Sequence, residues 1–109
     1  MDIGSIKMIW AVIRPETIDK IVKALMSGGF SAMTRFDVYG RGKQMGIEVA
    51  SENYDMPKTV LMLVVEADRV SEAVNIIEEH ARTGCIGDGR IFVAPIEQAY
   101  TIRTGEQGL

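Results

Sequence analysis

The sequence contains few of the residues that form covalent cross-links or metal sites. Among its 109 residues there is one cysteine, Cys85, and one histidine, His80. A single cysteine excludes an internal disulfide and suits a reducing compartment, so we expect a cytoplasmic protein. Two candidate ligands do not make a metal site. A histidine near the end of a helix is more typical of an interaction with the helix dipole.

Aromatic residues, net positive charge and long apolar runs are also scarce. Aromatic residues make up 6% of the chain and the formal net charge is −3. An RNA-binding sheet would need stacking aromatics and a basic surface, so we expect no nucleic-acid partner. The apolar run "KMIWAVI" is too short to span a bilayer. This length predicts no membrane span. Arg14 and Pro15 follow the run directly, so it has no cleavage site of the secretory kind.

The residues indicate no catalytic machinery. No general acid–base pair stands out in the sequence. An acylphosphatase-like enzyme would need an arginine and an asparagine around a phosphate. The only asparagines are Asn53, in a polar segment, and Asn75, in a predicted helix, both away from the glycine-rich segments. We therefore expect a regulatory protein and not an enzyme, with a phosphate-handling enzyme as the weaker alternative.

Two amphipathic helices are predicted from apolar residues at helical spacing. The first begins after Pro15 and ends at Gly28-Gly29, which offer a left-handed cap. The second is capped by Asp68 and ended by Gly84. The apolar stripes are Ile18, Ile21, Val22, Leu25 and Met26 in the first helix, and Val70, Ala73, Val74, Ile77 and Ala81 in the second.

Four apolar or β-branched segments read as strands, at residues 6–13, 30–40, 57–66 and 90–102, the last with Pro95 as a point of interruption. The order is therefore βαββαβ within one domain over residues 1–109. This predicts an α+β, ferredoxin-like fold with a four-stranded antiparallel sheet and two helices on one face. Residues 41–56 form a long loop, and loops of that length are usually functional.

The first and third strands are apolar on both alternating faces. Two helices cover only one face of the sheet, so the second face would expose a large apolar patch. We expect this face, which contains Met8, Trp10, Val60, Met62 and Val64 or the alternating set beside it, to be buried in an oligomer. Cover by the C-terminal tail is the alternative, although that tail is short and polar.

Two glycine-rich segments carry cations. "GRGKQMG" opens the loop at 41–56, and "ARTGCIGDGR" leads into the fourth strand. Each by itself also fits a solvated loop or a tight turn. Exposed backbone N–H groups beside cations can bind phosphate, and one phosphate ligand between the two segments would use both.

The sequence resembles the PII (GlnB-like) signal-transduction proteins over residues 7–106. The resemblance rests on "TGCIGDGRIFV" at 83–93, "YGRGKQMG" at 39–46, "MPK" at 56–58 and "IRTGE" at 102–106. It implies a trimer that binds ATP or ADP between subunits and 2-oxoglutarate beside Mg-ATP. It also implies that the long loop controls target proteins of nitrogen metabolism.

The resemblance assigns roles to individual residues. The phosphates would meet Gly42, Lys43, Gly87, Asp88, Gly89 and Arg90, together with Arg103 from across a subunit boundary, while Thr34, Gly40 and Val64 would line the adenine side. Gln44 would ligate Mg and contact both nucleotide and 2-oxoglutarate. Gly87 would also contact 2-oxoglutarate, and Lys58 would hold its distal carboxylate.

The sequence departs from the common PII pattern at several positions. Thr101 stands where many members carry an arginine, which removes one cation from the phosphate site. The loop is short, and neither Tyr54 nor Ser51 is identified as a modification site. The short loop and the ending "AYTIRTGEQGL" resemble the nitrogenase-associated subclass, and the shorter of its two partner chains. This implies inhibition of a nitrogenase component when 2-oxoglutarate is low, with a general nitrogen-metabolism regulator as the alternative.

Overall fold

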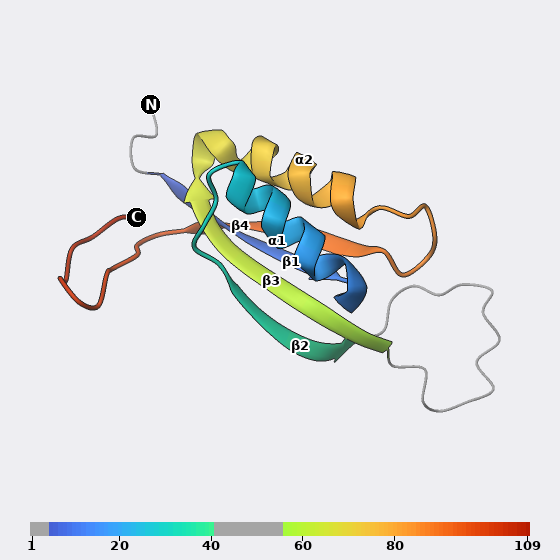
Figure 1. The fold of residues 1–109 in the computed structure, drawn as a ribbon. Helices are drawn as coiled ribbons and strands as arrows, with labels where there is room; N and C mark the ends of the chain where they lie inside the picture. The colour runs from blue at the N-terminus through green and yellow to red at the C-terminus, as the bar shows by residue number, and fades with distance from the viewer. Residues whose placement is uncertain (1–4, 41–55) are drawn as a thin grey trace.

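The computed structural model describes residues 5–40 and 56–109, which form one sheet covered by two helices (Figure 1). The elements are β1 (Ile6–Ile13), α1 (Ile18–Ser27), β2 (Thr34–Gly40), β3 (Met56–Glu66), α2 (Val70–Ala81) and β4 (Gly89–Ile96). The strands are antiparallel in the order β2-β3-β1-β4, and both helices lie on the same face. The predicted ferredoxin-like fold is confirmed.

The core lies between the helices and one face of the two central strands. Odd-numbered residues of β1 and β3 face the helices because side chains alternate along a strand. The buried cluster comprises Ile9, Ala11, Ile13, Leu61, Leu63 and Val65 from the sheet, with Ile18, Ile21, Leu25, Ala73, Ile77 and Ala81 from the helices. The predicted stripes are confirmed except at Met26, which is 56% exposed at the edge of α1.

The end of α1 follows the predicted glycine cap. Gly29 has a left-handed φ of +93°, and its N–H donates to the carbonyl of Met26 at 3.0 Å. The N–H of Phe30 donates to the carbonyl of Leu25 at 2.9 Å, which completes a Schellman motif. Phe30 is thereby turned into the core, so β2 begins at Thr34 and the predicted start at residue 30 is wrong.

The predicted ends of α2 are also wrong. Asp68 lies inside a 3-10 turn, Ala67–Arg69, and no side chain caps the start of the helix at Val70. The helix ends at Ala81, and the next residue, Arg82, is extended. Gly84 therefore belongs to the following loop, where its φ of +88° shapes a turn.

The predicted boundaries of the last two strands are each displaced. Met56, assigned to the long loop, is the first residue of β3, whereas the rest of that loop lies outside the described residues. The fourth strand ends at Ile96 and does not continue to residue 102. Pro95 is tolerated because β4 is an edge strand. Residues 97–109 form a tail with a single bridge between Tyr100 and Gln107.

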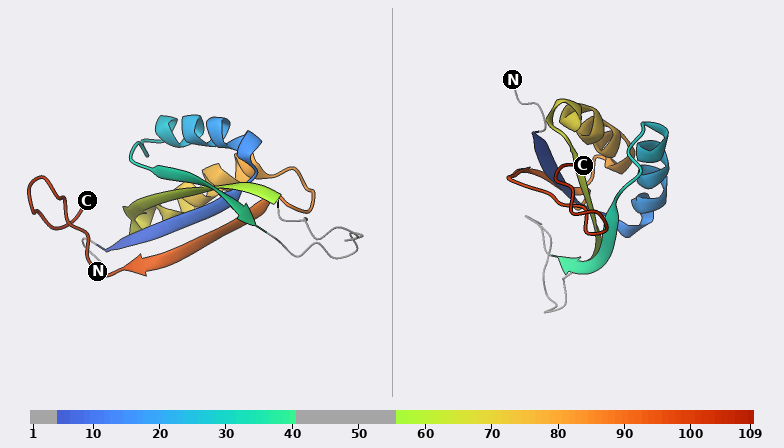
Figure 2. Two further views of the ribbon diagram at one scale, coloured as in Figure 1. Left: turned by 90° about the horizontal axis from the view of Figure 1, so that it is seen from below. Right: turned by 90° about the vertical axis from the view of Figure 1, so that its left-hand side faces the viewer.

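The sheet face away from the helices is apolar, and no other segment of residues 5–40 and 56–109 covers it. It presents the even-numbered side chains of the strands, among them Met8, Trp10, Phe36, Met62, Val64 and Phe92. The rings of Trp10 and Phe36 meet edge to face at 5.9 Å. The tail extends beyond the end of the sheet (Figures 1 and 2) and leaves Ile102 100% exposed. The tail is therefore not the cover of this face.

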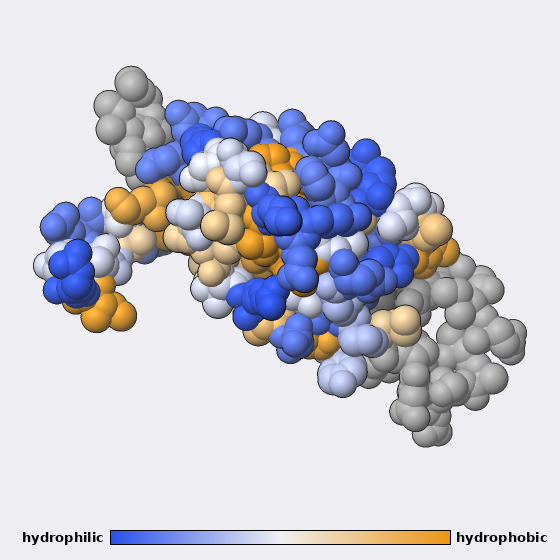
Figure 3. Space-filling view, in the orientation of Figure 1, coloured by the Kyte–Doolittle hydropathy of each residue, from blue (hydrophilic) through white to orange (hydrophobic). Residues whose placement is uncertain are grey.

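The outer surface of the helices has the opposite character. It is predominantly hydrophilic in the space-filling view (Figure 3). Within residues 5–40 and 56–109, neither helix has the length and apolar content needed to cross a membrane.

Candidate functional site

The loop between α2 and β4 is organised around one carboxylate, that of Asp88. Its Oδ2 accepts from the backbone N–H groups of Thr83 at 2.7 Å and Gly84 at 2.9 Å. Its Oδ1 accepts from the Thr83 hydroxyl and, at 3.2 Å, from Nε of Arg14. The bonds from Thr83, supported by those from Gly84 and Arg14, hold the pKa of Asp88 well below its usual range. Asp88 is therefore ionised and fixes the shape of the loop.

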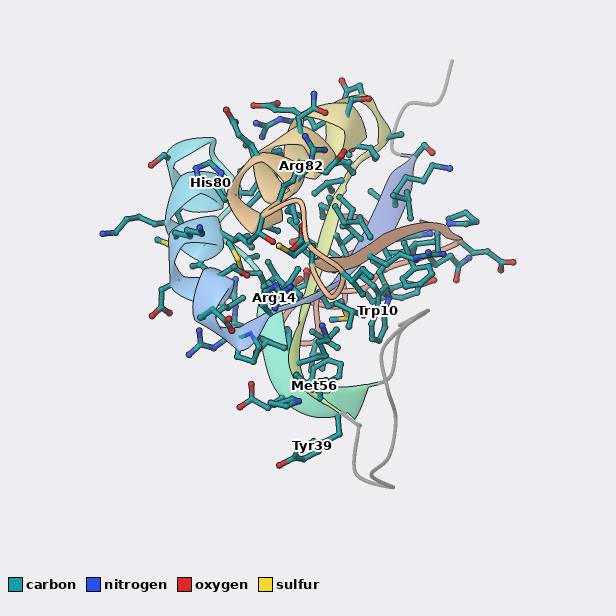
Figure 4. The ribbon with its side chains drawn as sticks, turned by 90° about the vertical axis from the view of Figure 1, so that its right-hand side faces the viewer. Trp10, Arg14, Tyr39, Met56, His80 and Arg82 are labelled. Atoms are coloured by element: carbon teal, nitrogen blue, oxygen red, sulfur yellow. The ribbon has the colours of Figure 1, made fainter. Side chains whose placement is uncertain are left out.

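Arg14 reaches the same loop from the end of β1. Besides its ion pair with Asp88, its Nη2 donates to the carbonyl of Ile86 at 2.8 Å. A Cβ added at Gly87 would lie 3.2 Å from the same Nη2, so the guanidinium packs directly against the glycine. Figure 4 looks onto this end of the molecule, with Arg14 near its centre and Tyr39 pointing outward.

Lys58 joins the loop from β3. Its Nζ donates to the carbonyl of Gly87 at 2.6 Å. Partial burial, together with the nearby charge of Arg14, lowers the pKa of Lys58 from its ordinary value of 10.5. Two residues that are 29 positions apart in the sequence, each a predicted ligand-binding residue, are thus in direct contact.

Gly89 and Arg90 begin β4 beside this loop. Gly89 has a φ of +113°, and a Cβ at this position would lie 1.8 Å from the carbonyl oxygen of Val12. Only glycine permits β4 to approach β1 so closely here. Arg90 is exposed and pairs with Val12. A groove of about 410 Å³ between α2 and β4 is lined in part by Asp88, Gly89 and Arg90.

The remaining predicted site residues lie near Lys58, outside the described residues, or away from the α2–β4 loop. Gly40 ends β2 on the same side of the molecule as Lys58, whereas Gly42, Lys43 and Gln44 lie outside the described residues. Thr34 pairs with Met62, further along β3. Val64 follows Lys58 by six residues, about 20 Å along a strand.

Arg103 is exposed in the tail, at the end of the sheet opposite to the α2–β4 loop (Figure 1). The single chain therefore does not bring Thr34, Val64 and Arg103 to the loop that contains Asp88.

Two residues of the loop network were missed by sequence reasoning. From the sequence alone, Arg14 is notable only as the residue that directly follows the first apolar run, and Thr83 has no predicted role of its own. Their partners are 74 and 5 residues away, and only Thr83 lies within the range of a local motif. The local signal in the sequence for this network is the Thr83 hydroxyl five residues before Asp88 in a glycine-rich turn.

Metal ligands are not grouped in the described part of the chain. No cluster of three or more His, Cys, Asp or Glu side chains occurs within residues 5–40 and 56–109. His80 directs Nδ1 to the carbonyl of Ile76 at 2.9 Å, near the end of α2. Cys85 is exposed in the loop. Gln44, the predicted Mg ligand, lies outside the described residues.

The similarity to known proteins extends over almost the whole chain. Residues 6–106 match the family model described as nitrogen regulatory protein P-II. The chain belongs to the PII family. It is 49% identical over 104 residues to the nitrogen fixation nifHD region GlnB-like protein 1 of Methanothermococcus thermolithotrophicus, covering 94% of this chain and 99% of that protein.

More general PII proteins are similar at a lower level. The nitrogen regulatory protein P-II 2 of Methanothermobacter thermautotrophicus is 40% identical over 107 residues, covering 94% of this chain and 93% of that protein. The crystal structure of Arabidopsis thaliana PII bound to citrate superposes with a TM-score of 0.80 at 36% identity, covering 94% of this chain and 85% of that one. The higher identity to nif-region proteins matches the nitrogenase-associated subclass, as the sequence predicted.

Proposed function

We propose that this PII protein senses ATP or ADP together with 2-oxoglutarate and regulates a nitrogenase component through the loop at 41–56. PII proteins are regulatory signal proteins, and the curated relatives named for the nif region supply the link to nitrogen fixation. In this proposal the protein is cytoplasmic and inhibits nitrogenase when 2-oxoglutarate is low.

The observation that carries the proposal is the bond from Lys58 to the carbonyl of Gly87. Lys58 is the predicted partner of the distal carboxylate of 2-oxoglutarate, and Gly87 begins the predicted phosphate segment. A dicarboxylate that draws the Lys58 ammonium away from Gly87 changes the loop that receives the nucleotide. Effector and nucleotide therefore influence each other through one hydrogen bond, and the coupling must be reciprocal.

The loop also has the chemistry that a nucleotide phosphate requires. Gly87 and Gly89 have positive φ angles of +101° and +113°, and backbone of this kind can turn its N–H groups toward an anion. The cationic side chains of Arg14, Lys58 and Arg90 occur at or beside the loop. The phosphates would be held by these backbone N–H groups and by Arg90, while the nucleotide supplies the site for Mg beside Gln44.

A complete site of this kind needs more than one copy of the chain. The predicted adenine residues Thr34 and Val64, and the phosphate residue Arg103, lie away from the α2–β4 loop of their own chain. Assembly into a trimer through the open face, which is the apolar sheet face away from the helices, would let one copy supply the loop while its neighbour supplies Thr34, Val64 and Arg103. In this arrangement both the uncovered face and the divided site have one explanation.

Isothermal titration calorimetry with ATP, Mg and 2-oxoglutarate added in each order tests the proposal. We expect 2-oxoglutarate to bind only when Mg-ATP is present, and Lys58→Ala to abolish that binding while ATP binding persists. Lys20→Ala, which removes an exposed lysine of α1, is the matched control. Tight 2-oxoglutarate binding without nucleotide, or an intact response in Lys58→Ala, would contradict the mechanism.

A nitrogenase assay separates the subclass proposal from the alternative of a general nitrogen regulator. We expect the protein to inhibit nitrogenase activity with ATP present, and 2-oxoglutarate to relieve the inhibition. Proteins of this subclass occur as two partner chains that act together, so the assay is run with and without a second PII-like chain of the same cell. Effector binding without any effect on nitrogenase in either assay would favour the general regulator.

A further inference from the structure

Arg14, which directly follows β1, contacts three consecutive residues of the α2–β4 loop, residues 86–88. Its Nε donates to Asp88, its Nη2 donates to the carbonyl of Ile86, and the same Nη2 would lie 3.2 Å from a Cβ at Gly87. The Arg14 and Asp88 side chains are 25% and 22% exposed, so the ion pair is partly shielded from water. Partly buried pairs are screened less by salt than surface pairs.

The backbone of Arg14 is itself held in place. Its carbonyl accepts from the Thr17 N–H at 3.0 Å and from the Thr17 hydroxyl at 2.8 Å. Pro15 begins the 3-10 turn and fixes φ at that position. Thr17 is 4% exposed, so these bonds lie against the core. The guanidinium therefore projects from a rigid junction between β1 and α1.

The hydrogen bonds to Asp88 show what Arg14 contributes to the loop. Asp88 accepts from Thr83, Gly84 and Arg14, and only Arg14 belongs to a different part of the fold. Without it the Asp88 bonds keep the turn closed upon itself but no longer fix the turn against β1. The Ile86 carbonyl would also lose its bond from Arg14, while Lys58 would still hold the Gly87 carbonyl.

We propose that Arg14 is a positioning residue for the nucleotide: it holds the backbone of residues 83–89 against β1 so that the Gly87 and Gly89 N–H groups face the phosphates. This inference rests on the proposed nucleotide function and adds a residue for which the sequence predicts no binding role. Lysine cannot replace Arg14, because a single ammonium cannot reach both the Asp88 carboxylate and the Ile86 carbonyl in the fork geometry of a guanidinium.

The test compares Arg14→Lys and Arg14→Met with the control Arg35→Met. Arg35 forms an exposed 3.4 Å ion pair with Asp19 on α1. Two quantities are measured for each variant: ATP affinity by calorimetry, and hydrogen exchange at the amides of Thr83 and Gly84 in the nucleotide-free protein. Thermal unfolding verifies that each variant is folded, and Arg14→Lys keeps the test valid if Arg14→Met does not fold.

Both Arg14 variants are expected to bind ATP about tenfold more weakly, the effect of losing one hydrogen bond to a charged group. They should also exchange the Thr83 and Gly84 amides faster, and Arg35→Met should change neither quantity. Weaker ATP binding with unchanged amide exchange would mean that Arg14 is a direct phosphate ligand, which overturns the positioning role. Unchanged ATP affinity in both variants would overturn it as well while leaving the proposed function intact. Absence of ATP binding by the unaltered protein would overturn both.

Discussion

At the scale of single residues, the α2–β4 loop depends on glycines whose reasons for being glycine differ. Gly84 and Gly89 both have positive φ, +88° and +113°, but no atom lies within 4 Å of a Cβ built at Gly84. A Cβ at Gly89 would collide with the Val12 carbonyl oxygen at 1.8 Å. The first glycine serves backbone conformation alone, whereas the second also serves the contact between two strands.

Gly89→Ala is therefore expected to destabilise the protein more than Gly84→Ala. Gly84→Ala should cost about 1–2 kcal/mol, the penalty for placing an L residue in the left-handed region. Gly89→Ala adds the separation of β4 from β1 and should exceed that value clearly. Urea denaturation of both variants at one protein concentration measures the difference. Equal losses would show that β4 shifts without cost.

The ionised state of Asp88 makes a prediction about acid. Its pKa is depressed in the folded state, so its contribution to stability is complete above the ordinary aspartate pKa of 3.8. That contribution is lost as the pH falls from there through the folded-state pKa. We expect Asp88→Asn to lower the unfolding midpoint more at pH 7 than at pH 3. Asp19→Asn, which alters an exposed ion pair, is the control and should have a small effect at both. An equal effect of Asp88→Asn at both pH values would refute the charge-based explanation.

At the scale of elements, Arg69 connects the end of α1 to the start of α2. Its Nη2 donates to the carbonyl of Gly28 at 2.7 Å, and its guanidinium lies 4.0 Å from the centre of the Phe30 ring. It also pairs with Glu72 in the first turn of α2. One side chain thus satisfies a helix-end carbonyl and covers a core aromatic, which explains how the two helices keep their relative position at this end.

Arg69→Met is expected to lower the melting temperature by several degrees, because it removes the bond to the Gly28 carbonyl and the cation–π contact. Arg82→Met is the matched control, since Arg82 forms an exposed ion pair with Glu78 at 2.8 Å. The control should shift the melting temperature little. Differential scanning calorimetry compares the two, and equal shifts would show that Arg69 contributes no more than a surface charge.

At the scale of the whole molecule, one face of the sheet has no cover from the part of the chain that the structure describes. Phe92 is 51% exposed and Phe36 is 40% exposed on that face; Trp10 pairs with Phe92 across the strands, and its ring meets that of Phe36. The helices present a hydrophilic surface on the other side (Figure 3). Apolar surface of this extent favours association, at roughly 25 cal/mol for each Å² removed from water.

Trp10→Lys is therefore expected to dissociate the predicted trimer, because it places a charge at the centre of the open face. Met26→Lys makes a similar change on the exposed outer side of α1 and should leave the assembly unchanged. Analytical ultracentrifugation at micromolar concentration distinguishes the two. A stable monomer of the unaltered protein would contradict the prediction, and so would a trimer of Trp10→Lys.

The sequence by itself determined the element order, the apolar stripes and the family. These depend on local periodicity and on contiguous motifs, such as the segment around Gly87 and Asp88. The tertiary structure decided where the elements begin and end. β2 begins only at Thr34 because Phe30 packs in the core, and β4 continues past Pro95 because it is an edge strand. The tertiary structure also decided which distant residues meet: the contacts of Arg14 with Asp88 and of Lys58 with Gly87 span 74 and 29 positions. Nothing local specifies such contacts, because they exist only once the antiparallel strands have placed the end of β1 and the start of β3 beside the loop.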